Sequence, residues 1–101
     1  MITEMAILSA LPGQDDELGR AIRRGIEFIR QDPGCVRAEV ARGVEQPGRF
    51  VVTVGWTSLA AHVDGFRGTP QFGQWIGAIR GLFDPQTLDT QHYTPYPQVR
   101  G

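Results

Sequence analysis

The chain has 101 residues, which corresponds to one domain, and 41% of them are hydrophobic, enough for a globular core rather than a disordered segment. The net charge is −1 and there are no blocks of basic or acidic residues, so nothing in the charge pattern favours nucleic-acid binding. No apolar run approaches the roughly 20 residues that span a bilayer. We therefore expect a single domain over residues 1–101 with no nucleic-acid and no membrane partner.

The cysteine and histidine residues indicate the cellular compartment and whether a metal site is expected. Cys35 is the single cysteine, so an internal disulfide cannot form, and no Lys or Arg precedes the first apolar stretch as it would in a signal peptide. We expect a cytoplasmic protein. The two histidines and Cys35 are scattered over different predicted elements without metal-ligand spacing, so we expect no metal site.

The first third of the chain predicts a strand and a helix. Residues 2–10 alternate loosely between two phases that are both fairly apolar, which is typical of a strand covered on both faces. Pro12-Gly13 ends it. Residues 14–31 predict a helix, with acidic residues at its start and a terminating turn at residues 32–34. Its buried stripe is expected to comprise Leu18, Ala21, Ile22, Gly25, Ile26 and Ile29.

Residues 35–41 and 49–56 read as two strands joined by a short connection rich in turn-forming residues. In the second strand one face carries Phe50, Val52, Val54 and Trp56, and the other carries Val51, Thr53 and Gly55. Neither face is strongly polar, so we expect both faces to be covered.

Two helices and a last strand are predicted for the rest of the chain. Thr57 or Ser58 can cap a short helix on which Leu59, His62, Val63 and Phe66 fall together. Thr69-Pro70 predicts the start of a second helix, ended by Asp84-Pro85. Residues 87–94 predict a strand, and residues 95–101 an extended tail. The stripe of the second helix consists of Phe72, Trp75, Ile76, Ile79, Leu82 and Phe83.

The order β-α-β-β-α-α-β predicts an α+β, ferredoxin-like sandwich in which helices cover one face of a four-stranded antiparallel sheet. The other face would leave an apolar patch in water. A second copy of the chain is the simplest cover, so we expect a homodimer.

The chain also resembles a known family. The run F-x-V-x-x-x-W-T-S-x-x-A-H-x-x-x-F-R-x-T-P-x-F, which begins at Phe50, and H-Y-T-P from His92 resemble the antibiotic biosynthesis monooxygenases. The resemblance implies a dimeric α/β barrel and a cofactor-independent monooxygenase, or related small enzyme, acting on a small aromatic or quinol-type molecule. It implies no cofactor.

Two departures from the family's pattern limit the expected chemistry. Haem-degrading members are expected to carry an Asn in the first strand, and here that strand has none. Oxygenases of polyketide-type phenols are expected to carry an Asn four residues before the strand-end Trp, and Val52 occupies that position. The sequence therefore leaves open a second interpretation, a non-catalytic dimeric module of the same fold that binds a small molecule or acts as a stabilising partner.

If the protein has a site, His62 is its most plausible catalytic residue, because histidine exchanges a proton near neutral pH. A buried structural histidine is the competing interpretation, and packing alone can account for Trp56. An open pocket lined by Trp56, His62 and Trp75 would favour an enzyme, and a pocket filled by these rings would favour the non-catalytic module.

His92 and Tyr93 are neighbours in a strand, so they point to opposite faces. The expected substrate-binding residues are Trp56, Phe66, Phe72, Trp75, His92 and Tyr93.

Overall fold

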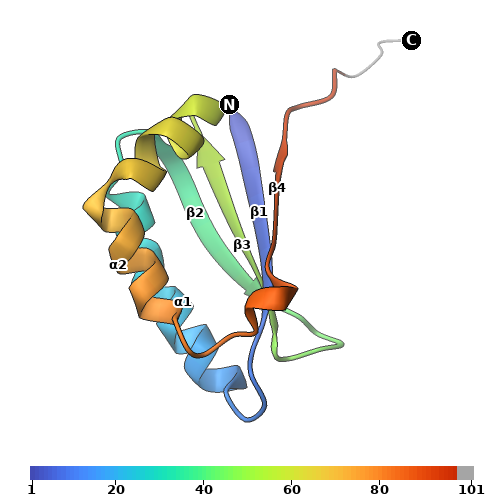
Figure 1. The fold of residues 1–101 in the computed structure, drawn as a ribbon. Coiled ribbons are helices and arrows are strands. Elements are labelled where there is room, and N and C mark those ends of the chain that lie inside the picture. The colour runs from blue at the N-terminus through green and yellow to red at the C-terminus, as the bar shows by residue number, and fades with distance from the viewer. Residues whose placement is uncertain (98–101) are drawn as a thin grey trace.

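A four-stranded antiparallel sheet forms one layer of the molecule, and helices form the other (Figure 1). We analysed a computed structural model, which describes residues 1–97. The strands are β1 (Ile2–Ser9), β2 (Cys35–Arg42), β3 (Arg49–Trp56) and β4 (Asp89–Tyr93), in the spatial order β2-β3-β1-β4. The helices are α1 (Asp15–Arg30) and α2 (Pro70–Ile79). The expected ferredoxin-like α+β fold is confirmed.

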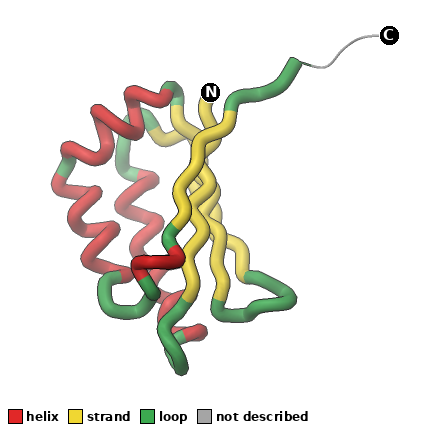
Figure 2. Tube along the Cα trace, turned by 45° about the vertical axis from the view of Figure 1, so that its right-hand side comes forward, coloured by secondary structure: helices red, strands yellow, loops and turns green. Residues whose placement is uncertain are grey.

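Both α-helices lie on the same side of the sheet, as Figure 2 shows from a second direction. The six residues predicted for the stripe of α1 are all buried. They pack against alternate residues of the strands, including Leu8, Phe50, Val52 and Val54, which are at most 4% exposed. Burial of these apolar side chains is the main force that holds the helical layer on the sheet.

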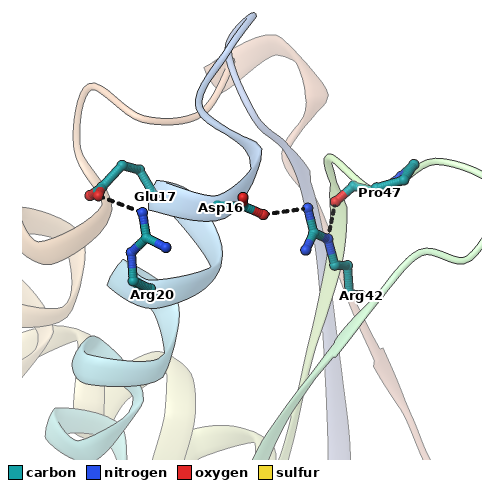
Figure 3. Close-up of polar contacts among 5 residues, drawn as sticks. All are labelled: Asp16, Glu17, Arg20, Arg42 and Pro47. Atoms are coloured by element: carbon teal, nitrogen blue, oxygen red, sulfur yellow. Dashed lines mark hydrogen bonds and ion pairs between the residues drawn. The ribbon is translucent and has the colours of Figure 1, made fainter.

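Arg42, the last residue of β2, ties the start of α1 to the loop between β2 and β3 (Figure 3). Its guanidinium donates to Asp16 at 2.9 Å and to the Pro47 carbonyl oxygen. Glu17 and Arg20 pair along the same helix. These pairs lie at the surface, where an ion pair typically contributes about 0–1 kcal/mol, so the contacts of Arg42 orient the loop more than they stabilise the fold.

The segment before α2 is not the regular short helix that the sequence predicts. Ser58 is its cap, since its hydroxyl accepts a hydrogen bond from the Ala61 N–H. The chain then forms a π-helical turn, η1 (Ala61–Gly65), and a 3₁₀ turn, η2 (Phe66–Gly68). His62 and Phe66 are buried, but the predicted grouping with Leu59 and Val63 is wrong, because these two are 48% and 39% exposed. A π turn is wider than an α turn, so it changes which residues share a face.

Helix α2 begins as predicted and ends earlier than predicted. The Thr69 hydroxyl accepts the Phe72 N–H, and Pro70 is the first helical residue. The helix ends at Ile79 rather than before Asp84, because Gly81 has a φ of +81° and closes a turn in which the Leu82 N–H bonds to Ile79. Leu82 and Phe83 follow the helix and still pack against the core.

The end of the described chain also differs from the predicted boundaries. A 3₁₀ turn, η3 (Pro85–Thr87), precedes β4, which is shorter at both ends than the strand expected over residues 87–94. The Asp84 side chain accepts from the Gln86 N–H and starts this turn. Of the tail expected over residues 95–101, residues 95–97 have no regular secondary structure, and the last four lie outside the described residues.

Candidate active site

A cavity of about 230 Å³ lies between the helical layer and the sheet. Sheet residues of β1 and β3 form its floor, and η1, η2 and α2 supply its wall. Most of the lining is apolar, and only a few side chains bring a polar or charged group to it. The polar members are Glu4, His62, Arg67 and Thr90, and the apolar ones include Phe66, Phe72, Trp75, Ile76, Ile79 and Phe83.

Glu4 brings a carboxylate to the apolar side of the sheet. It lies on the same face of β1 as Ala6 and Leu8, and its side chain is only 12% exposed. Its Oε1 accepts the indole N–H of Trp56 at 2.9 Å. A buried indole needs such a partner, and Glu4 supplies it. Among residues 1–97, the other carboxylate oxygen of Glu4 has no hydrogen-bond partner and is not sealed from solvent.

His62 is held by contacts on its face and at both ring nitrogens. The imidazole stacks on Trp56, with ring centroids 4.9 Å apart and an interplanar angle of 9°. Nδ1 is 2.7 Å from His92 Nε2, and Nε2 is 3.5 Å from Glu4 Oε1, which is long for a hydrogen bond. His62 is 4% exposed. Glu4 and His92 are direct neighbours across the β1–β4 pair, so the sheet register brings these two side chains together, and η1 adds His62.

Burial sets the ionisation of this cluster. It lowers the pKa of His62 to about 4, and the positive charge of Arg67 and the neighbouring His92 act in the same direction. His62 is therefore neutral at pH 7. Burial raises the pKa of Glu4, and the hydrogen bond from Trp56 and the basic side chains His92 and Arg67 offset only part of that rise.

The tautomers follow from these contacts. A neutral imidazole beside a carboxylate favours an N–H directed at that carboxylate, so we expect His62 to carry its proton on Nε2. In that tautomer Nδ1 would accept a hydrogen bond from His92 Nε2, 2.7 Å away. The site thus presents a carboxyl group with a raised pKa beside a neutral histidine, His62, which His92 contacts from the edge strand. This arrangement can bind a hydroxyl group and take its proton.

The structure brings six of the seven predicted site residues together. His62, Phe66, Phe72 and Trp75 line the cavity. Trp56 is fully buried and lies behind His62 rather than in the cavity wall, and His92 supports His62 from the edge strand. Tyr93 is not part of this group: it is 50% exposed and occupies the helix-free face, opposite to His92.

Sequence reasoning missed Glu4 and Arg67. Glu4 could have been found, because it falls in phase with Ile2, Ala6 and Leu8 and is therefore a carboxylate on the apolar phase of a strand. Arg67 carries no comparable signal. It follows Phe66 directly in η2, and only the tertiary structure shows that it borders the cavity.

Within residues 1–97, no group of three or more His, Cys, Asp or Glu side chains is arranged to hold a metal ion. In the same residues, none of the helices combines the length and the apolar character needed to cross a membrane.

Comparison with known proteins agrees with this architecture. The family described as antibiotic biosynthesis monooxygenase matches residues 1–78, more than three quarters of the chain. The chain belongs to this family. The matched residues of the antibiotic biosynthesis monooxygenase domain include β1 with Glu4, and the segment with Trp56 and His62.

Individual relatives extend the match to nearly the whole chain. The uncharacterized protein YczJ of Bacillus subtilis is 26% identical over 99 residues, which cover 98% of this chain and 94% of YczJ. A Bordetella bronchiseptica protein with the same family description is 21% identical with a TM-score of 0.85, over 95% of this chain and 97% of its own. SnoaB, a cofactor-independent oxygenase from Streptomyces nogalater, is 20% identical with a TM-score of 0.79, over 99% and 97%. These two structural matches concern the fold.

Proposed function

We propose that the protein is a cofactor-independent monooxygenase that acts on a small phenol or quinol. One observation carries the proposal: an apolar cavity contains a buried carboxylate and a buried neutral imidazole, Glu4 and His62, joined to each other and to Trp56. Burying a charged group costs free energy that hydrogen bonds offset only in part, and carboxylates with perturbed pKa values in cavities are typical of active sites. Membership of the family and the oxygenase SnoaB among its structural neighbours support the same reaction class.

The cavity volume limits the size of the substrate. A cavity of about 150 Å³ lined by apolar side chains is known to hold one benzene ring. The cavity here, at about 230 Å³, leaves room for a substituted single ring or a compact pair of fused rings. The aromatic side chains of Phe66, Phe72 and Trp75 are suited to contact such rings.

The proposed reaction needs only the substrate and dioxygen. A base removes a phenolic proton, and the electron-rich anion gives electrons to dioxygen and forms a C–O bond on the ring. The resulting hydroperoxide then loses its ring C–H proton while the O–O bond breaks, and the departing oxygen leaves as water. For a hydroquinone, C₆H₆O₂ + O₂ gives the hydroxyquinone C₆H₄O₃ + H₂O. The protein supplies the base, a dry cavity and a held geometry.

The non-catalytic module is less well supported. In that interpretation the aromatic rings would fill the space between the layers. Instead, Phe72 and Trp75 border an open volume, whereas Trp56 is packed behind His62. The polar groups at the cavity would also have no role in a module that only stabilises a partner.

The test is oxygen uptake by purified protein with substituted hydroquinones and dihydroxynaphthalenes, with product mass measured under ¹⁸O₂. We expect one ¹⁸O atom in each product molecule and the other in water. His62→Gln should weaken binding of these ligands at least severalfold, whereas Arg23→Ala, on the exposed face of α1, is the matched control and should leave binding unchanged. Uptake no faster than the uncatalysed rate with all of these compounds would contradict the proposed function.

The proposal includes self-association. The helices cover one face of the sheet, and the helix-free face, which we define by Thr3, Met5, Ile7, Val51, Thr53 and Tyr93, is left uncovered by the chain itself. A homodimer that pairs these faces would form the dimeric barrel that the sequence predicts.

A further inference from the structure

We infer that Glu4, rather than His62, is the residue that exchanges a proton with a hydroxyl ligand in the cavity, and that His62 and His92 position its carboxylate. The inference rests on the proposed function for the class of ligand, an aromatic hydroxyl compound. It assigns a role to a residue that sequence reasoning did not identify.

The two carboxylate oxygens of Glu4 differ in their surroundings. Oε1 accepts the Trp56 N–H at 2.9 Å and faces His62 Nε2 at 3.5 Å. The second oxygen has no hydrogen-bond partner within residues 1–97, although Glu4 borders the cavity. A carboxylate can accept several hydrogen bonds, so this oxygen has unused capacity. A ligand hydroxyl in the cavity is the group that can use it.

His62 is less well placed to accept the proton. Its Nδ1 is engaged by His92 at 2.7 Å, and its Nε2 faces Glu4. Its imidazole is also fixed by stacking on Trp56, so the ring cannot turn toward a ligand without losing these contacts. With a pKa of about 4 it is also a weaker base than an ordinary histidine. The contacts instead suit a donor that holds Glu4 in one orientation.

Glu4 can serve as base and acid in the same turnover. Its carboxylate takes the phenolic proton, so the O–H bond of the ligand breaks and an O–H bond forms on Glu4. After the ring anion has bonded to dioxygen, Glu4 returns that proton to the distal peroxide oxygen. The regenerated carboxylate then takes the ring C–H proton, which leaves with the departing oxygen as water. The raised pKa of Glu4 reduces the mismatch with a phenol and favours the first transfer.

The first test uses para-nitrophenol, whose visible absorption reports its ionisation, and para-nitroanisole, which lacks the hydroxyl. In the wild-type complex without turnover the proton should stay on the phenol, hydrogen-bonded to ionised Glu4, at pH values at which the free phenol ionises, because phenolate beside the Glu4 carboxylate would place two negative charges together. The other titratable or charged side chains near Glu4 are His62 in η1, Arg67 in η2, His92 in β4 and Cys35 in β2.

Glu4→Gln should weaken para-nitrophenol binding about tenfold, the usual effect of losing a hydrogen bond to a charged group, and should abolish the shift in its ionisation. Binding of para-nitroanisole should be unchanged. Equal affinities for the phenol in both proteins, or an unshifted ionisation in the wild type, would overturn the inference. So would failure of the wild type to bind the phenol. The wild-type titration decides the matter even if Glu4→Gln does not fold.

The second test addresses the positioning role of the two histidines. Long-range ¹H–¹⁵N spectra of the wild type should show His62 protonated on Nε2 only and His92 protonated on Nε2. A His62 protonated on Nδ1 would overturn the assignment, because its Nε2 could then not donate to Glu4. A protein that gives these results and still consumes no oxygen would have the inferred proton acceptor and lack the proposed oxygenase activity.

Discussion

At the residue scale, the site is made of side chains that are each common but are placed where they cost free energy. Glu4 occupies a strand position whose neighbours on the same face, Ala6 and Leu8, are core residues. Desolvation of its carboxylate is offset only in part by the hydrogen bond from the Trp56 N–H. Replacement of Glu4 by an apolar residue would remove that cost. Its presence is therefore better explained by chemistry than by stability.

Trp56, Phe66, Phe72, Trp75 and the two histidines were predictable at this scale, because aromatic residues and histidine stand out in a short chain. The contacts that these residues make with one another and with Glu4 were not predictable from the sequence. The bond between His62 and His92 joins residues 30 positions apart, and that between Trp56 and Glu4 joins residues 52 apart. Sequence periodicity shows which face a residue takes and does not show which partner lies across from it.

The lowered pKa of His62 predicts a pH dependence of stability. Unfolded, His62 has a pKa near 6.5, and in the folded protein about 4, so between these values only the unfolded chain takes up the proton. The free energy of unfolding therefore falls as the pH drops from 6.5 toward 4. Between pH 7 and 5 this contribution is about 2 kcal/mol. Protonation of Glu4, whose pKa is raised, acts in the opposite direction.

Urea unfolding of the wild type and His62→Gln at pH 7 and pH 5 isolates the His62 contribution, since all other groups are shared. We expect the variant to lose about 2 kcal/mol less than the wild type over this interval. Parallel behaviour of the two proteins would show that His62 is not held in a neutral, buried state.

At the element scale, β3 is the strand on which the core depends most. Val54 lies in its middle, is fully buried and is paired with Glu4 of β1 and Ala38 of β2. Val54→Asp would bury an unpaired charge and should destabilise the protein by at least about 3 kcal/mol. Arg23→Ala, on the exposed side of α1, should change stability by no more than about 0.5 kcal/mol. Thermal unfolding of the two variants checks this, and similar melting temperatures would contradict the strand assignment.

Two glycines around helix α2 should respond to alanine with opposite signs. Gly81 has a φ of +81° in the turn after the helix, so Gly81→Ala should cost about 1 kcal/mol even though no atom lies within 4 Å of the new methyl group. Gly73 lies within the helix and has equally open surroundings, so Gly73→Ala should stabilise by about 0.5–1 kcal/mol. Chemical unfolding of both variants is the measurement. Stabilisation by Gly81→Ala would mean that the helix continues past Ile79.

The boundaries that sequence reasoning missed have local physical causes. Apolar residues continue at helical spacing to Phe83, so periodicity alone extends α2, whereas the positive φ of Gly81 ends it. Likewise, the π turn at Ala61–Gly65 is a rare geometry, and the residue propensities of this segment do not predict it. Caps were more predictable, because Ser58 and Thr69 are standard helix-capping residues.

At the scale of the whole molecule, the element order was enough to predict the fold, since β-α-β-β-α-α-β with short connections leaves few topologies. The polarity of the helix-free face was predicted only in part. The helix-free face carries Met5, Ile7 and Val51, but charged residues of β2 and β4, including Arg37, Glu39 and Asp89, share it. An interface there would combine an apolar centre with a polar rim, as stable protein interfaces do.

This face predicts the assembly state. We expect a homodimer in which the helix-free faces pair and more than about 2,000 Å² is buried in total, the range of obligate dimers. Ile7 lies beside Val51 on that face, so Ile7→Lys would place a charge in the apolar centre and should give a folded monomer. Arg23→Ala, on the helical side, is the control and should stay dimeric. Light scattering at micromolar concentration measures the mass directly. A wild-type protein that remains a stable 11.2 kDa monomer would show that the helix-free face is tolerated in water.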